Sequence, residues 1–190
     1  AKLFSYPADQ RGIKFVHREN VFDDFDRQAL IPRMLSRDGP ALVTGDLNGD
    51  GREDAFFGGA AGSASSIFFQ ESNGTFEASP NQLPDAEKRY EDVNALLFDA
   101  DGDGDNDLYV TSGGSAFANG SDRYQDRLYR NEGGKFVRAT LPTMPTSTGP
   151  VRAVDYDANG DLDLVVGGRS VPGGYPRAPR SYLLQNNGGK

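Results

Sequence analysis

One nine-residue pattern of acidic and small residues occurs three times in the chain. The copies begin at Asp46, Asp99 and Asp155, hence 53 and then 56 residues apart. Each copy has aspartate at positions one and nine, aspartate or asparagine at positions three and five, and glycine at position six. Carboxylates held this close repel one another, so each loop is unfavourable unless a cation lies at its centre.

The composition of these loops predicts calcium binding. Oxygen ligands on a flexible turn suit a hard cation, and crowded carboxylates favour Ca²⁺ over Mg²⁺, which keeps more of its water. Positions one, three, five and nine offer side-chain oxygens, and position seven offers its backbone carbonyl. The candidate ligands are Asp46, Asn48, Asp50, Arg52, Asp54, Asp99, Asp101, Asp103, Asp105, Asp107, Asp155, Asp157, Asn159, Asp161 and Asp163. We predict about three calcium ions, one per loop, which would offset much of the net charge of −8.

An EF-hand and a metal-free turn are the alternatives to this assignment. An EF-hand requires a bidentate glutamate at position twelve and flanking helices, whereas position twelve is Phe57, Val110 and Val166, each inside a predicted strand. Asp, Asn and Gly also favour turns without any metal, which explains one such loop more easily than three matched ones. We therefore expect calcium with a structural role, fixing a turn between two strands.

Four short apolar segments follow one another in each repeat, which predicts an all-β fold. The expected strands are residues 41–44, 54–58, 66–70 and 75–78, then 93–98, 108–110, 127–130 and 135–137, then 151–154, 164–166 and 181–184. Asn73-Gly74 is a hairpin signal, and the glycine pairs 113–114, 133–134, 167–168 and 188–189 are expected turns. Four strands per repeat near 50 residues is the signature of a β-propeller blade; a β-sandwich is the alternative.

The expected organisation is an N-terminal segment followed by three propeller blades of four antiparallel strands. Residues 1–40 form the segment, with a short strand at 12–17 and a helical turn within 21–31, packing on the blades. The blades span 41–90, 91–148 and 149–190, and the last is incomplete because the chain stops at Lys190. Closed propellers have about four to eight blades. The chain is therefore expected to be an incomplete propeller: a fragment, an open arc, or a half-ring closed by self-association with a second copy.

Bulk composition excludes several classes of protein. With 36% hydrophobic and 25% charged residues, the chain is not of the disordered type. Its acidity argues against nucleic-acid partners, and no apolar run reaches the 18 residues of a membrane span. Zero cysteines exclude a disulfide framework. No signal peptide begins the sequence shown, so export implies a processed chain.

The loops D-x-[DN]-x-[DN]-G-x-x-D between apolar strands resemble FG-GAP or VCBS-type repeats, the calcium-carrying blades of integrin α-subunits. Residues 57–61 (FGGAA) are similar to the Phe-Gly…Gly-Ala-Pro signature. Residues 126–131 (DRLYRN) and 182–188 (YLLQNNG) look like the third-strand pattern of bacterial surface proteins of the ASPIC/UnbV and cartilage-acidic-protein type. The resemblance implies a seven-bladed ring, an extracellular or cell-surface location, and adhesion or recognition rather than catalysis. The number of blades departs from it.

Two functions are consistent with these features. The first is an extracellular calcium-binding module that recognises a protein or polysaccharide, and the second is the propeller portion of a polysaccharide-active enzyme such as a lyase. We expect no enzyme activity, because His17 is the only histidine and no catalytic motif occurs. Loops 115–125 and 169–180 carry arginine and aromatic residues and are candidate ligand-binding loops.

Overall fold

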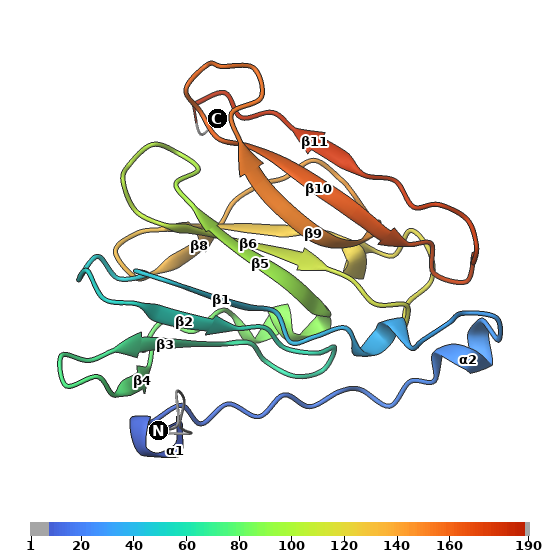
Figure 1. Cartoon of the computed structure of the whole chain (residues 1–190), viewed down its shortest axis with the longest axis horizontal. Coiled ribbons are helices and arrows are strands. Elements are labelled where there is room, and N and C mark those ends of the chain that lie inside the picture. The colour runs from blue at the N-terminus through green and yellow to red at the C-terminus, as the bar shows by residue number, and fades with distance from the viewer. Residues whose placement is uncertain (1–7, 189–190) are drawn as a thin grey trace, which may run out of the picture.

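The structure, a computed structural model, describes residues 8–188. Residues 1–7, the predicted turn residue Gly189 and the chain end at Lys190 lie outside the described residues. Three antiparallel sheets dominate the described part of the chain, and we call them blades 1, 2 and 3 (Figure 1). They comprise β1 (Leu42–Gly45), β2 (Asp54–Phe57), β3 (Ser66–Gln70) and β4 (Phe76–Ala78); β5 (Asp92–Phe98), β6 (Asp107–Ser112), β7 (Arg127–Asn131) and β8 (Phe136–Arg138); and β9 (Ser147–Val154), β10 (Asp163–Ser170) and β11 (Tyr182–Leu184).

The blades stack in sequence order and form an open arc. Within each sheet, neighbours in sequence pair as antiparallel hairpins. The first strands β1, β5 and β9 contact one another in turn, and they lie at the inner edge of the stack (Figure 1). The described sheets do not close into a barrel. The predicted all-β fold of antiparallel propeller blades is confirmed, whereas the division into 1–40, 41–90, 91–148 and 149–190 stays a prediction.

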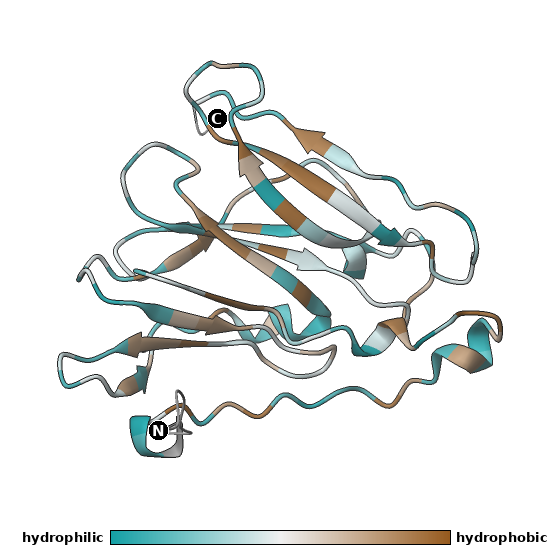
Figure 2. Cartoon of the chain, viewed as in Figure 1, coloured by the Kyte–Doolittle hydropathy of each residue, from teal (hydrophilic) through white to brown (hydrophobic). Residues whose placement is uncertain are grey.

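The hydrophobic core consists of two layers, one between each pair of adjacent blades. The first layer joins residues of blades 1 and 2, and the second joins residues of blades 2 and 3. Equivalent residues pack against the following blade in the first two repeats: Phe56 of β2 and Tyr109 of β6 are each 0% exposed. In blade 3 the equivalent Val165 is 46% exposed, and its cross-strand partner Leu183 is 50% exposed. Brown colour marks this hydrophobic stretch of the sheet in Figure 2.

The N-terminal segment runs along blade 1 as an extended chain with little regular structure (Figure 1). The expected strand at residues 12–17 is wrong: it has no sheet partner, and its alternation reflects packing of Phe15 on Phe57, whose rings stack 5.1 Å apart. The expected helical turn within 21–31 is confirmed by α2 (Asp24–Arg27), which Asp23 caps through the Phe25 N–H.

Helix is confined to short stretches. Besides α2, the described chain has α1 (Ala8–Arg11) and the 3₁₀ helices η1 (Leu35–Arg37), η2 (Asp85–Arg89) and η3 (Asp122–Tyr124). Sequence patterns missed η2 and η3 because each is a short stretch, of five and three residues, inside a connection. Between residues 8 and 188, no helix has the length and apolar character needed to cross a bilayer.

The expected turn at Gly167-Gly168 is also wrong, because both glycines lie inside β10. That strand stays paired with β9 as far as Ser170, with register shifts around Gly168. A Cβ on Gly168 would lie 2.2 Å from the carbonyl oxygen of Arg180. Glycine is therefore needed at 168 for the close approach of a neighbouring chain segment, not for reversal of the strand.

Candidate metal centres

The backbone of each acidic loop is shaped by residues with positive φ at positions four and six. Glycine adopts this conformation without steric cost. The residues are Gly49, Gly51, Gly102, Gly104, Ala158 and Gly160. Ala158, with φ of 58°, is the exception and costs loop three about 1 kcal/mol. Each loop therefore coils tightly enough to turn its carboxylates towards its centre.

The position-one carboxylate organises the amides of its own loop. Both oxygens of Asp46 accept backbone N–H groups, including that of Gly51 at 2.7 Å. Asp99 accepts from Gly102 and Gly104 in the same way, at 2.7 and 3.1 Å. Burial raises the pKa of Asp46, but the four backbone donors outweigh it and hold that pKa below its ordinary value. This carboxylate is therefore ionised and ready to ligate a cation.

The position-nine carboxylate ties the loop to the third strand of its blade. Asp54, Asp107 and Asp163 are each 0% exposed. One oxygen of Asp107 accepts the Ala100 N–H at 2.8 Å and the other accepts the Asn131 N–H at 2.7 Å. The other two blades repeat both bonds. The repeated pattern predicts only a metal ligand at position nine and gives no sign of this second role.

Burial changes the acidity of these position-nine groups. It raises the pKa of Asp54 and of Asp107, which backbone hydrogen bonds counteract and the nearby loop carboxylates reinforce. A cation at the loop centre would reverse that electrostatic cost, because it favours the ionised form of every carboxylate around it.

The structure brings the acidic ligands of loops two and three together. One oxygen each from Asp99, Asp101 and Asp107 lies within 4.8 Å of the others, and Asp155, Asp157 and Asp163 form the same group in loop three. Oδ1 of Asp101 is buried and has no hydrogen-bond partner among the described residues. An oxygen of this kind, surrounded by carboxylates, fits a hard divalent cation.

The other predicted ligands of loops two and three are not part of these two carboxylate groups. Asp103 lies outside the loop-two group, and its carboxylate accepts the Asp105 N–H at 2.9 Å. Asn159 accepts the Asp161 N–H at 2.7 Å. Ligation by position five and by the carbonyls of Arg52, Asp105 and Asp161 stays a prediction.

Loop one differs from the other two because one of its own residues, Arg52, has a positively charged side chain. The guanidinium of Arg52, at position seven, pairs with Asp50 at position five and donates from Nε to the Gln70 carbonyl at 2.6 Å. Position three is Asn48, so this loop also has one carboxylate fewer than loop two. We expect the calcium affinities of the loops to follow these charges, with loop two the tightest.

Replacing Arg52 with alanine is expected to tighten calcium binding to loop one. At a dielectric close to that of water, one unit charge about 5 Å from a dication opposes binding by roughly 1–2 kcal/mol, so the gain is about five- to thirtyfold. Calorimetric calcium titration measures it in a chain that also carries Asp101→Asn and Asp157→Asn. Arg130→Ala in the same background is the control, and an unchanged loop-one affinity in Arg52→Ala contradicts the role given to its charge.

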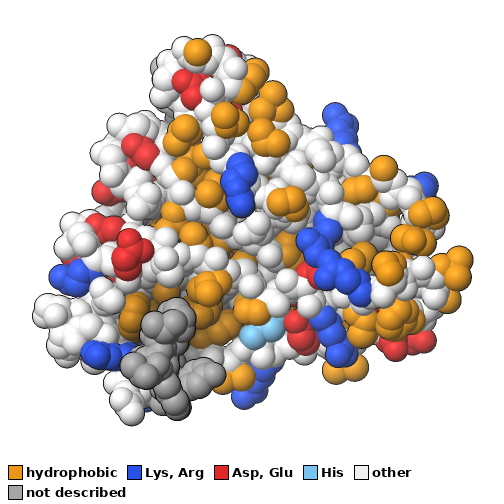
Figure 3. All heavy atoms as spheres, in the orientation of Figure 1, with side chains coloured by type: hydrophobic (Ala, Val, Ile, Leu, Met, Phe, Trp, Pro, Cys, Tyr) orange, Lys and Arg blue, Asp and Glu red, His pale blue; other side chains and the backbone are white. Residues whose placement is uncertain are grey.

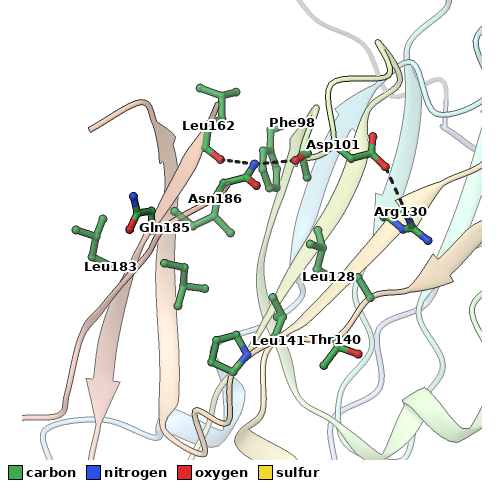
Figure 4. Close-up of a pocket in the computed structure, with 15 residues that line it drawn as sticks. Phe98, Asp101, Leu128, Arg130, Thr140, Leu141, Leu162, Leu183, Gln185 and Asn186 are labelled. Atoms are coloured by element: carbon green, nitrogen blue, oxygen red, sulfur yellow. Dashed lines mark hydrogen bonds and ion pairs between the residues drawn. The ribbon is translucent and has the colours of Figure 1, made fainter. Parts of the chain in front are cut away.

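An asparagine at or just beyond the end of the third strand connects blades 2 and 3 to the acidic loop of the blade before. Nδ2 of Asn131 donates to the carbonyl of Leu47 in loop one at 3.0 Å and to its own loop at Asn106. Asn186 repeats this contact, donating to Ala100 of loop two at 2.7 Å, as dashed lines show in Figure 4. Both residues lie within the quoted third-strand pattern, but nothing in the sequence assigned them a contact between blades.

A pocket of about 340 Å³ opens beside this contact, between blades 2 and 3. Its walls are largely apolar. Asp101 and Arg130 lie side by side on its blade 2 wall (Figure 4), with Nη1 of Arg130 3.8 Å from Oδ2 of Asp101. A candidate calcium ligand therefore also lines the seam between two blades.

Asp126 and Arg127 lie at the start of β7, the strand that ends at Asn131, and hold it in place. Asp126 accepts hydrogen bonds from Tyr109, from the Ser112 N–H and from Thr148 of blade 3. Arg127, 1% exposed, pairs with Asp92. Burial raises the pKa of Asp126 to about 7, against the effect of its three donors and of Arg127. These two residues were missed because a charge beside an apolar strand has no sequence signal for burial.

The candidate ligand-binding loops lie at the ends of the strands away from the acidic loops, against the N-terminal segment. Arg27 of α2 donates to the carbonyl of Ser115 at 3.0 Å and to that of Phe117 at 2.6 Å. Tyr124 is buried and donates to the same Phe117 carbonyl, so it stabilises the loop and is not available to contact a ligand. Arg169 pairs with Asp38, whereas Arg177 and Arg180 are exposed.

The fold and these loops together define a class: a repeat protein built of propeller blades, each with an acidic loop between its first two strands. A family model described as an FG-GAP-like repeat matches residues 46–110 and 99–166. The chain belongs to this family, which confirms the resemblance drawn from the loops. A search of curated proteins found no match to the chain.

Proposed function

We propose that the chain is a calcium-stabilised, extracellular recognition module that binds a protein or polysaccharide and is not an enzyme. The observation that carries the proposal is the repeated convergence of positions one, three and nine in loops two and three. FG-GAP repeats are typical of extracellular proteins, which supports the location. Extracellular calcium is abundant enough to fill even weak sites of this kind.

Calcium in these loops has a structural role in the proposal. The position-nine aspartate links the loop to the third strand, and the asparagine of the next blade holds the carbonyl at position two. An ion at the loop centre would therefore brace both a hairpin and the contact between blades. No catalytic role is assigned to any residue, and the one histidine lies beside Glu19, 3.0 Å from its carboxylate.

The proposed recognition surface is the end of the blades opposite the acidic loops. Hydrophobic and basic side chains gather over α2 and the loop after β10 on the right of Figure 3. Phe25 and Tyr175 are 43% and 52% exposed there, and the Tyr175 N–H is held by Gln28 of the N-terminal segment at 2.9 Å. Exposed aromatic and arginine side chains on a braced loop are typical of binding surfaces.

A glycan and protein binding screen, run in calcium and in chelator, tests this function. Stable binding that weakens in chelator, and that is lost on Tyr175→Ala with the fold intact, supports a calcium-stabilised recognition module. Turnover of an acidic polysaccharide without stable binding would instead establish the lyase class of function.

Asp101→Asn separates metal binding from folding. Oδ1 of Asp101 has no hydrogen-bond partner among the described residues, so the substitution removes ligand charge at little cost to the metal-free fold. With calcium about 100-fold above Kd, loss of one site lowers the melting temperature by about 5–10 °C. The melting temperature in chelator should stay close to that of the wild type. Equal losses in both buffers would count against metal ligation by Asp101.

A further inference from the structure

A second group of metal-ligating side chains lies at the other end of blade 2. His17 and Glu19 belong to the N-terminal segment, and Glu91 directly precedes β5. One ligand atom from each lies within 4.8 Å of the others, and Nε2 of His17 is 3.0 Å from Oε1 of Glu19. The seven-residue strand β5 separates Glu91 from Asp99, which places this group roughly 25 Å from loop two.

Glu91 is the buried member and provides independent evidence for a ligand. It is 1% exposed; Oε2 accepts the Ala61 N–H at 2.9 Å, whereas Oε1 is buried with no hydrogen-bond partner among the described residues. Nδ1 of His17 and Oε2 of Glu19 are buried and unpartnered in the same way. Buried polar atoms are nearly always paired, so an unpaired oxygen on the buried Glu91, in a group whose other two members each also have an unpaired atom, calls for a bound species.

The charges around this group favour a cation. Asp38 and Asp92 also act on Glu91 electrostatically, but Asp92 is paired with Arg127, and Asp38 is paired with arginines of its own. In the described chain, Glu91 has no arginine or lysine within ion-pair distance, and Glu19 pairs only with His17. Burial, reinforced by these carboxylates, raises the pKa of Glu91 to about 8. A buried carboxylate of this kind is neutralised either by a proton or by a metal ion.

We propose that His17, Glu19 and Glu91 bind a first-row transition-metal dication, with Zn²⁺ as the representative ion. One imidazole nitrogen and two carboxylate oxygens form a ligand set that suits zinc, whereas the acidic loops offer oxygen alone and suit calcium. Tetrahedral ligation at 2.0–2.2 Å requires ligand atoms about 3.4 Å apart. The side chains thus need to close by roughly 1 Å, and His17 and Glu19 lie on a segment without regular structure that can supply this movement.

The position of the group gives the ion a specific structural effect and an entry path. It links an extended segment to the first strand of blade 2, across a connection that has no sheet pairing. The side chains of His17 and Glu19 are 15% and 26% exposed, and the single histidine (pale blue) is visible at the surface in Figure 3. A metal ion bound there would fasten the N-terminal segment to the blades.

Calorimetric titration of the full chain with Zn²⁺, in excess calcium to fill the loops, tests this site. The variants are His17→Gln and Glu91→Gln. Glu132→Gln, an exposed acid on another loop, and Asp101→Asn are the controls. We expect the wild type and both controls to bind one Zn²⁺ with the same affinity, and each test variant to lose about tenfold or more. Melting temperatures in chelator identify any variant that fails to fold.

The histidine gives a second, independent readout. His17 is the only histidine, so its ring signals in NMR are unique and should shift on addition of Zn²⁺ in calcium buffer. This measurement uses the unmodified chain and holds even if Glu91→Gln does not fold. Absence of zinc binding in the wild type, equal zinc affinity in His17→Gln, or loss of zinc binding in Asp101→Asn would each overturn the proposal.

Discussion

Replacing Asp107 with alanine is expected to lower the free energy of unfolding by about 2–6 kcal/mol, in chelator as well as in calcium. Both oxygens of this carboxylate accept backbone N–H groups, from Ala100 and Asn131, in a site that is 0% exposed. Alanine leaves two buried donors unpaired, at about 1–3 kcal/mol each. Calcium adds a further loss, because the same carboxylate belongs to the loop-two ligand group.

Urea unfolding in the two buffers measures this effect, and Asp103→Ala is the matched control. Asp103 is an exposed acid of the same loop whose carboxylate accepts the neighbouring Asp105 N–H, so in chelator its removal should cost about 1 kcal/mol or less. If Asp107→Ala is destabilised only in calcium, then Asp107 is a ligand and not a structural tie.

Replacing Asp126 with alanine is expected to cost about 3–5 kcal/mol, because three buried donors then lose their acceptor. One of these donors, Thr148, belongs to the next blade, while Tyr109 and Ser112 belong to the same blade. The substitution therefore loosens blade 2 and its contact with blade 3 together. Thermal unfolding should show this loss with or without calcium, since Asp126 lies outside the acidic loops.

The ionisation of Asp126 also predicts a pH dependence. Burial raises its pKa from an ordinary 3.8 to about 7 in the folded chain. The folded state therefore binds this proton more tightly than the unfolded state. Its stabilising contribution is complete below pH 4 and is lost as the pH rises through 7. Relative to Asp126→Asn, which cannot ionise, the wild type should become less stable between pH 4 and 8; parallel stability curves would contradict this assignment.

The repeated features were predictable because three copies reinforce one another. The acidic loops, the strands that flank them and the hairpin at Asn73-Gly74 all follow from patterns that recur at one spacing, and β3 was predicted with its observed bounds. The glycines at 167–168 were misassigned because the sequence does not distinguish a glycine that permits close chain approach from one that permits a turn. Only the position of Arg180 in space distinguishes the two.

The contacts between distant segments were not predictable from local pattern. His17 and Glu91 are far apart in sequence, on a segment without regular structure and at the start of a strand, so no periodicity links them. Asn131 reads as the end of a strand, and its bond to Leu47 depends on how blades 1 and 2 stack. The double role of the position-nine aspartates was hidden for the same reason, since the second acceptor contact lies on another strand.

The asparagine contacts between blades have a consequence for the calcium binding proposed above. Leu47 and Ala100 are the second residues of loops one and two, and their carbonyls are held by Asn131 and Asn186 of the following blades. Docking of the next blade therefore supports the shape of the loop, and an ion bound in the loop would favour that docking in return. We therefore expect calcium binding to be cooperative between neighbouring loops. Each ion should stiffen the contact between its own blade and the next one.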